Sequence, residues 1–176
     1  MGLSRDLARW ISNLKYEDLP SDVVDRARGV TLHGLTSALL GSRTPGGKEA
    51  LELMREEEAG GGGNGTVWVD GGKLTRGGAA FVNAEMQLAG GKWDTYRMLT
   101  HPGVMIMPAA MVACEATGAS GKDYITGIVC GYEVLERIAR DFVPQIMSQG
   151  FHTAPVIGII GAAVAGTAPS GSTAAN

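Results

Sequence analysis

The chain lacks the residues from which several classes of protein build their sites. It has two cysteines among 176 residues, Cys114 and Cys130, and neither a Cys-x-x-Cys pair nor a histidine cluster accompanies them. A disulfide framework, a zinc site and an iron–sulfur cluster are therefore not predicted, and we expect neither a metal nor a cofactor. Both cysteines lie in apolar stretches, which predicts buried thiols that behave as small hydrophobic side chains.

Long apolar runs and clusters of positive charge are missing too. No run of about 18 apolar residues occurs, so no membrane-spanning helix is predicted. The amino-terminal segment has no apolar core of the kind found in signal peptides and carries acidic residues early, so we expect a cytoplasmic protein. The net charge is −3 and the Lys and Arg residues are scattered, which gives no electrostatic footprint for binding nucleic acid.

Helical periodicity is the main pattern that is present. Apolar residues make up 44% of the chain, enough for one globular core. The spacing of apolar residues and of capping residues predicts helices near residues 3–14, 21–40, 48–58, 78–88, 105–116, 120–138 and 156–168. Ser120 followed by Asp123 matches a capping box, with Asp in place of Glu, at the start of the sixth of these helices. Residues 66–69 (Thr-Val-Trp-Val) alternate in polarity and are rich in β-forming residues, and the turn signal Asp70-Gly71 follows them. This pattern predicts one short β-hairpin near residues 66–75. The expected fold is mainly α, a helical bundle-like domain over residues 1–168, with a disordered tail at 169–176.

Glycine is abundant, with 27 residues, and its positions carry information. The run at 60–65 indicates a flexible loop after the third helix. In the last helix Gly158, Gly161 and Gly166 recur with alanines, which favours close approach of a neighbouring helix and not a membrane dimer.

Two polar interruptions hold most of the side-chain chemistry. Residues 89–103 have mixed polarity and no periodicity, and a second interruption covers residues 150–153. Loops held by a rigid scaffold are frequent places for catalytic groups. His101 is the first candidate for proton transfer because imidazole titrates near neutral pH, with Asp94 and Thr95 as neighbours that could orient it. His152 is the second candidate, although either histidine could instead serve only in packing or capping.

Four stretches, in order, carry a resemblance to a known family. They are LARWISNLKYEDLPSDVVDRAR, RGGAAFVNAEMQLAGGKWDT, THPGVMIMPAAMVACEATGASGKDYITGIVCGYEVLERI and QGFHTAPVIGIIGAAVAG. Together they resemble the MmgE/PrpD family, which includes 2-methylcitrate dehydratase and cis-aconitate decarboxylase. His-Pro alone is common, but the order and spacing of all four stretches indicate the amino-terminal helical part of this family.

The resemblance implies an enzyme that works without a cofactor. It implies a lyase (dehydratase or decarboxylase) or an isomerase that acts on a small polycarboxylic acid by acid/base chemistry next to a carboxylate. The residues it implies as catalytic are His101, Thr95, Asp94 and His152. Lys92 and Arg97, the cations of the loop, and Tyr96 are the candidates for substrate binding, and the alternative for the two cations is plain surface charge. His33, on the second helix, is expected to be structural.

Two departures from the family leave a second interpretation open. Gly91 stands where family members usually have Asp, and family chains are more than twice as long, with further substrate-facing lysines in their second half. The chain is therefore expected to need a complementary carboxy-terminal chain or to form a homo-oligomer. The alternative is a non-catalytic relative that serves as a binding or assembly subunit.

Overall fold

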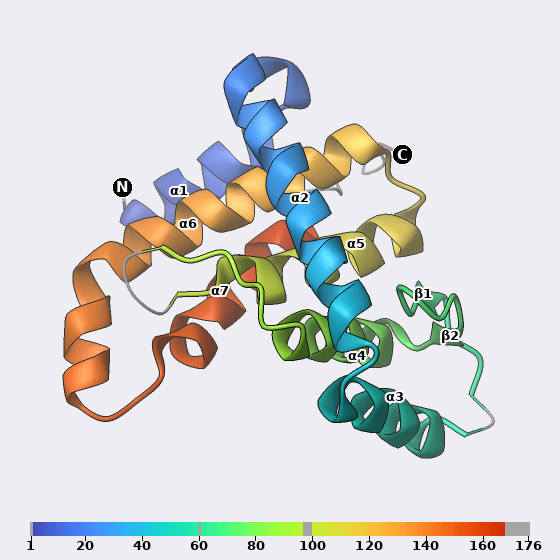
Figure 1. Ribbon diagram of the computed structural model, residues 1–176. Helices are drawn as coiled ribbons and strands as arrows, with labels where there is room; N and C mark the ends of the chain where they lie inside the picture. Colours follow the sequence, from blue (N-terminus) through green and yellow to red (C-terminus); the bar gives the residue numbers. More distant parts are fainter. Residues whose placement is uncertain (1, 60, 97–99, 168–176) are drawn as a thin grey trace.

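The described part of the chain is almost entirely helical (Figure 1). The computed structural model describes residues 2–59, 61–96 and 100–167. Within them the predicted mainly α fold with a single β-hairpin is confirmed. The α-helices are α1 (Leu3–Asn13), α2 (Ser21–Gly41), α3 (Pro45–Glu57), α4 (Arg76–Ala89), α5 (Pro102–Thr117), α6 (Gly121–Ser148) and α7 (Thr153–Thr167). A 3-10 turn covers Tyr16–Asp18, and the antiparallel strands are β1 (Gly65–Thr66) and β2 (Lys73–Leu74).

Local sequence signals set several helix ends. The side chain of Ser120 accepts a hydrogen bond from Asp123 N, and the Asp123 carboxylate accepts one from Ser120 N, so the predicted capping box at the start of α6 is confirmed. Helix α5 begins at Pro102, three residues before the predicted start. Proline suits this first helical position because the missing N–H has no partner there and its φ is already helical. Pro102 and Gly103 therefore belong to the helix and not to the polar loop.

Helix α7 packs against both α5 and α6 and closes the larger part of the core. A Cβ atom added at Gly131 of α6 would lie 2.9 Å from the Cβ atom of Ala165 and 2.9 Å from the carbonyl oxygen of Gly161. The helix backbones thus approach closely where both carry small residues. This confirms the prediction of close packing along the last helix.

A second, smaller core joins α2, α3 and α4 to the hairpin. The buried side chain of Asn83 accepts a hydrogen bond from Trp68 N (2.8 Å) and donates one to the carbonyl oxygen of Thr66 (2.9 Å). One amide therefore satisfies two backbone groups of the hairpin, as a buried polar side chain must.

The cysteines are free and buried, as predicted. Burial raises the pKa of both thiols to about 11, so both stay protonated and unreactive near neutral pH. No helix in the described residues is long and apolar enough to cross a membrane. The predicted disordered tail, 169–176, lies outside the described residues.

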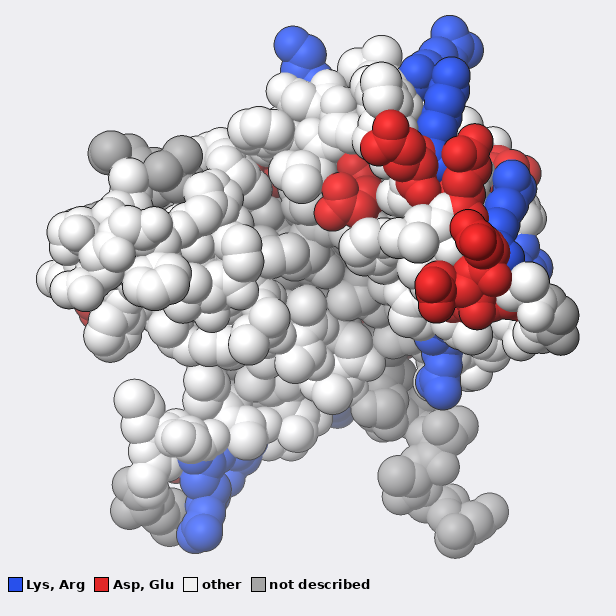
Figure 2. All heavy atoms as spheres, turned by 90° about the horizontal axis from the view of Figure 1, so that it is seen from below, with Lys and Arg blue, Asp and Glu red and all other residues white. Residues whose placement is uncertain are grey.

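Charge is unevenly distributed over the surface. Seen from below, acidic side chains gather at the end of the molecule where α3 lies, and a wide part of the same face is uncharged (Figure 2). Helix α3 carries Glu49, Glu52, Glu56 and Glu57 against Lys48 and Arg55. Helix α7 carries no charged residue at all between Thr153 and Thr167.

The crossing of α2 over α4 yields a stability prediction. A Cβ atom at Gly41 would collide with the carbonyl oxygen of Met86 and lie 2.7 Å from Gly90 N. Gly41→Ala should lower the free energy of unfolding by about 1–3 kcal/mol, the usual cost of overpacking. Gly29→Ala is the matched control on the same helix, because its Cβ atom would meet nothing within 4 Å. It should raise stability by up to about 1 kcal/mol. Urea unfolding of both variants tests this, and equal effects would contradict the described crossing.

Candidate functional site

The polar loop starts where α4 is anchored to α2. The Ser37 hydroxyl donates a hydrogen bond to the carbonyl oxygen of Gln87 (2.8 Å) and accepts one from Lys92 N (3.3 Å). Gly91, between them, has a φ of 67°, in the left-handed region that favours glycine. The chain thus turns sharply at Gly91 and enters the loop from a fixed position.

His101 is the last residue before α5, and residues of the polar loop contact its side chain. Its side chain is largely buried, at 7% exposure. Its Nδ1 atom lies 3.1 Å from the carbonyl oxygen of Asp94 and 3.3 Å from the Thr95 hydroxyl. A carbonyl oxygen can only accept, so this hydrogen bond places the proton of the neutral ring on Nδ1. The Nε2 atom is then the one with a lone pair, able to take a proton from a bound molecule.

Two aromatic rings flank the ring of His101. The Trp93 ring lies 4.8 Å away between centroids, and its indole N–H donates to the carbonyl oxygen of Leu88 (2.7 Å). The His152 ring is stacked at 6.0 Å, with 28° between the ring planes. Residues 51 positions apart in the sequence are thereby brought to one place, with His101 buried and His152 exposed.

Each histidine stands directly before a helix. His101 precedes Pro102 at the start of α5, and His152 precedes Thr153 at the start of α7. The amino-terminal ends of helices carry partial positive charge and unpaired N–H groups, which favour anions. The positive ends of two long helices therefore converge on the same pair of imidazole rings.

Asp94 contacts His101 through its backbone and uses its carboxylate elsewhere. The Tyr132 hydroxyl, on α6, donates to Asp94 Oδ2 (2.6 Å), and Gly103 N donates to both carboxylate oxygens (3.1 Å each). Part of the positive end of α5 is therefore taken up by Asp94. The Asp94 carboxylate ties the loop to α5 and α6, whereas its carbonyl oxygen faces the imidazole.

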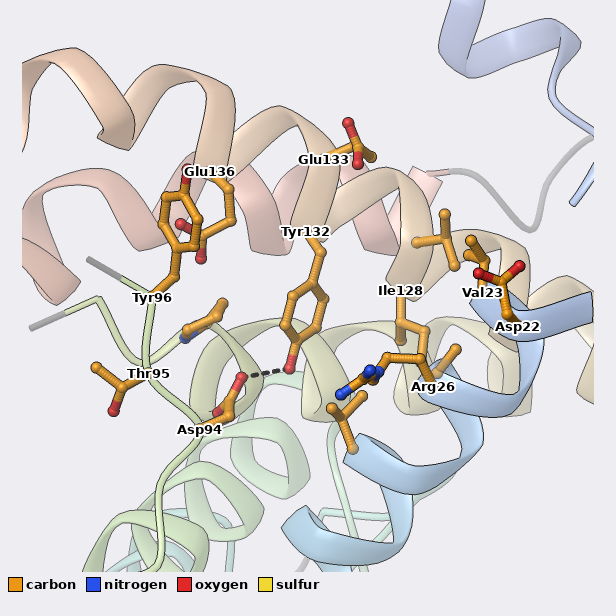
Figure 3. A pocket seen from close by; sticks show the side chains of 14 residues that line it. Asp22, Val23, Arg26, Asp94, Thr95, Tyr96, Ile128, Tyr132, Glu133 and Glu136 are labelled. Atoms are coloured by element: carbon orange, nitrogen blue, oxygen red, sulfur yellow. Dashed lines mark hydrogen bonds between the residues drawn. The ribbon is translucent and has the colours of Figure 1, made fainter. Parts of the chain in front are cut away.

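A cavity of about 450 Å³ lies on the α2 and α6 side of the loop (Figure 3). Figure 3 shows Asp94, Thr95 and Tyr96 on one side of it, Tyr132 and Glu136 from α6 above, and Arg26 from α2 opposite. Among the described residues that line it, carboxylates belong to Asp22, Asp94, Glu133 and Glu136, and a guanidinium belongs to Arg26. Neither His101 nor His152 lines the cavity. Its excess of negative charge disfavours a polyanionic ligand.

Burial shifts the titration of two α6 residues beside the loop. For Glu136, burial first and the charge of Asp94 second raise the pKa to about 7, and the Thr100 hydroxyl, 3.4 Å away, partly opposes this. For Tyr132, burial first and then the Asp94 charge raise the pKa far above its usual range. Tyr132 therefore keeps its proton and acts only as a donor toward Asp94.

The structure brings together some of the predicted residues and separates others. Asp94, Thr95, His101 and His152 meet around the imidazole rings. The Lys92 side chain is exposed, Tyr96 lines the cavity, His33 is exposed on α2, and Arg97 lies outside the described residues. Among the described residues no three His, Cys, Asp or Glu side chains are grouped so as to hold a metal ion.

Sequence reasoning missed the part that α6 plays. Neither Tyr132 nor Glu136 is among the site residues predicted from the sequence. Both project from α6 one helical turn apart and reach the loop. The signal that could have found Tyr132 is a hydroxyl on the buried stripe of an amphipathic helix, because a buried hydroxyl needs a partner.

The fold and the site define a class: a helical domain in which two separate polar segments place two histidines side by side at the starts of two helices. The chain belongs to the MmgE/PrpD family, because the family profile described as the MmgE/PrpD N-terminal domain matches residues 5–175. It is 27% identical over 175 residues to the cis-aconitate decarboxylase-like protein oryM of Aspergillus oryzae. It is 28% identical over 172 residues to a cis-aconitate decarboxylase of Aspergillus terreus.

These similarities cover 93% of this chain but 35% and 34% of the two relatives. The chain therefore spans about a third of the length of the curated relatives it matches. No solved structure gives a significant match.

The raised pKa of Glu136 predicts how stability depends on pH. The pKa is about 7 in the folded chain against an ordinary 4.5, so the folded state binds this proton more tightly than the unfolded state. The native chain should lose stability relative to Glu136→Gln as the pH rises from about 4.5 to about 7, and the difference should stay constant above that. Urea unfolding at several pH values measures it. Glu57→Gln, exposed on α3, is the matched control for loss of one carboxylate, and a Glu136→Gln difference that is independent of pH would contradict the described burial.

Proposed function

We propose that the chain forms the amino-terminal part of a cofactor-independent lyase or isomerase site for a small polycarboxylic acid. The observation that carries the proposal is the geometry of His101. Its Nδ1 atom is engaged by the carbonyl oxygen of Asp94, and its ring stacks on His152 where two helices begin. The names of the relatives support a decarboxylase, with cis-aconitate as the first substrate to test.

His101 is proposed as the group that moves the proton. With Nδ1 protonated, Nε2 can take a proton from a carbon next to a carboxylate and later return it. In dehydration the C–H bond breaks toward His101 and the hydroxyl group leaves with a proton as water. In decarboxylation the bond to the departing carboxylate breaks, its electron pair stays on the carbon skeleton, and protonated His101 donates a proton to carbon. Isomerisation needs only removal of the proton and its return at another face or carbon.

The carboxylates of the substrate are proposed to lie on the histidine side of the loop. The positive ends of α5 and α7 favour anions there, and the exposed Thr95 can donate a hydrogen bond. The side chains of Lys92 and Arg97 are the nearest cations in the sequence and are proposed to balance further negative charge. The cavity on the α6 side is an unsuitable place for a polyanion, because four carboxylates line it.

The site is proposed to be completed by further protein. Phe151, just before α7, is 63% exposed. On α7, a helix without charge, Ile159 is 69% exposed and Val156 is exposed as well. Contiguous apolar surface of this kind marks contacts with other protein. A second copy of the chain, or the region equivalent to the rest of the longer relatives, is proposed to cover it.

A non-catalytic binding or assembly subunit is the second candidate, and Gly91 is the observation that favours it. A Cβ atom at Gly91 would meet nothing within 4 Å, but φ is positive there. An Asp at this position would be strained only mildly, since Asp tolerates the left-handed region better than most residues. The loss of the family's carboxylate therefore removes a chemical group while the loop keeps its shape. Turnover that depends on His101 would rule this candidate out.

Proton exchange tests the proposed function. The chain is incubated in heavy water with cis-aconitate, citrate, 2-methylcitrate or itaconate, and the C–H signals are followed by proton NMR. Exchange or product formation should fall at least about 10²-fold in His101→Gln, the usual contribution of one acid–base participant. His33→Gln is the matched control, because His33 is exposed on α2. Equal activity in the two variants would contradict the proposed role of His101.

Association of the chain tests the proposed covering of α7. Size-exclusion chromatography with light scattering should show a dimer or larger species, because association removes apolar surface from water and so lowers the free energy. Ile159→Asp should shift the distribution toward the monomer. Glu52→Asp, on the exposed acidic helix α3, is the control and should leave the distribution unchanged. A native chain that is monomeric at all concentrations contradicts the proposal of a second copy.

A further inference from the structure

Helix α6 contacts the loop at two points that are one helical turn apart. The Tyr132 hydroxyl donates to the Asp94 carboxylate (2.6 Å), and the Glu136 carboxylate lies 3.4 Å from the hydroxyl of Thr100. The Thr100 hydroxyl in turn donates to the carbonyl oxygen of Tyr96 (2.6 Å). The first of these contacts lies at the residue whose carbonyl oxygen meets His101.

The absence of a side chain at Gly103 is what allows Tyr132 and Asp94 to meet. A Cβ atom there would lie 2.7 Å from Asp94 Oδ1 and 2.8 Å from the Tyr132 hydroxyl. Both distances are shorter than a carbon atom tolerates. The first turn of α5 therefore contributes the Gly103 N–H donor to this hydrogen-bonded cluster and leaves room for the Tyr132 hydroxyl and the Asp94 carboxylate to meet.

Three groups fix Asp94 from different directions. Tyr132 and Gly103 donate to its carboxylate, and His101 Nδ1 donates to its carbonyl oxygen. Because the carboxylate and the carbonyl group belong to one residue, holding the first restricts the rotation of the second. The proton of a neutral imidazole sits on whichever nitrogen has a fixed acceptor.

We propose that Tyr132 is a positioning residue that, through Asp94, holds the neutral ring of His101 in the form that carries its proton on Nδ1. Tyr132 does not touch the imidazole. It fixes the acceptor of the imidazole and so leaves Nε2 free to take a proton. The consequence for catalysis rests on the proposed function, whereas the position of the proton on the ring does not.

The experiment is ¹⁵N NMR of the full chain with labelled histidine, at a pH where the rings are neutral. The chain has three histidines, so His33→Gln and His152→Gln assign the signals. In the native chain the two nitrogens of His101 should have shifts typical of a protonated Nδ1 and an unprotonated Nε2. In Tyr132→Phe both shifts should move toward the average of the two forms. Tyr124→Phe is the matched control, because Tyr124 is also a tyrosine of α6 but its hydroxyl lies 3.4 Å from Thr31, and it should leave the His101 shifts unchanged.

Gly103→Ala provides a second test, because the added methyl group separates Tyr132 from Asp94. It can also replace Tyr132→Phe if that variant does not fold. It should shift the His101 signals in the same direction as Tyr132→Phe. If Tyr132→Phe, or Gly103→Ala in its place, keeps the native ¹⁵N shifts, the positioning role is overturned, whatever the activity. If the native chain itself has its proton on Nε2, the role is overturned as well.

Activity measurements separate this proposal from the proposed function. Where the native chain turns over an acid, Tyr132→Phe should lower kcat at least about tenfold, because a small misplacement of a catalytic group is costly, with a much smaller change in KM. Tyr124→Phe should keep native kcat. The ¹⁵N shifts of Tyr132→Phe can be averaged even if the native chain turns over none of the acids. That result would support the positioning role and count against the proposed function.

Discussion

The arrangement of the site depends on the several hydrogen bonds of Asp94. Its carboxylate joins the first turn of α5 to Tyr132 on α6, and its carbonyl oxygen meets the imidazole of His101. A hydrogen bond to a charged carboxylate is worth roughly twice a neutral one, so these contacts can hold an otherwise irregular segment in one conformation. Without them the loop would lose the hydrogen bonds that join Asp94 to both helices. His101 would then keep its place in the chain but not a defined acceptor for its ring proton.

The position of His101 between two environments follows from this link. On one side the ring packs against Trp93 and His152 beside two helix ends that favour anions. On the other side of the loop, the described residues that line the cavity include four carboxylates and one arginine. The charge of the described residues around this cavity is of the wrong sign for a polycarboxylate. The chemistry of the residues, and not the presence of a cavity, therefore locates the proposed site.

Much of the fold could be predicted from the sequence because its signals are local. Apolar residues at helical spacing, the Ser120–Asp123 box and the small residues of α7 each act within a few positions, and the helices that they predict are present, although α6 continues past residue 138 to Ser148. The two polar segments and their histidines could be selected because they interrupt this periodicity. What α6 adds could not be predicted in the same way. The contact between Tyr132 and Asp94 joins residues 38 positions apart, and it depends on how α5 and α6 cross, for which a single sequence has no local pattern.

The central claim is that a polycarboxylate binds on the histidine side of the loop, and NMR titration of the native chain with tricarballylate, a saturated tricarboxylate, tests it most directly. The ring signals of His101 and His152 should shift together and saturate, while those of His33 and Tyr132 stay in place. Shifts of the Tyr132 ring and of other residues around the cavity, with His101 and His152 unchanged, would contradict the claim and place the ligand on the opposite side of the loop.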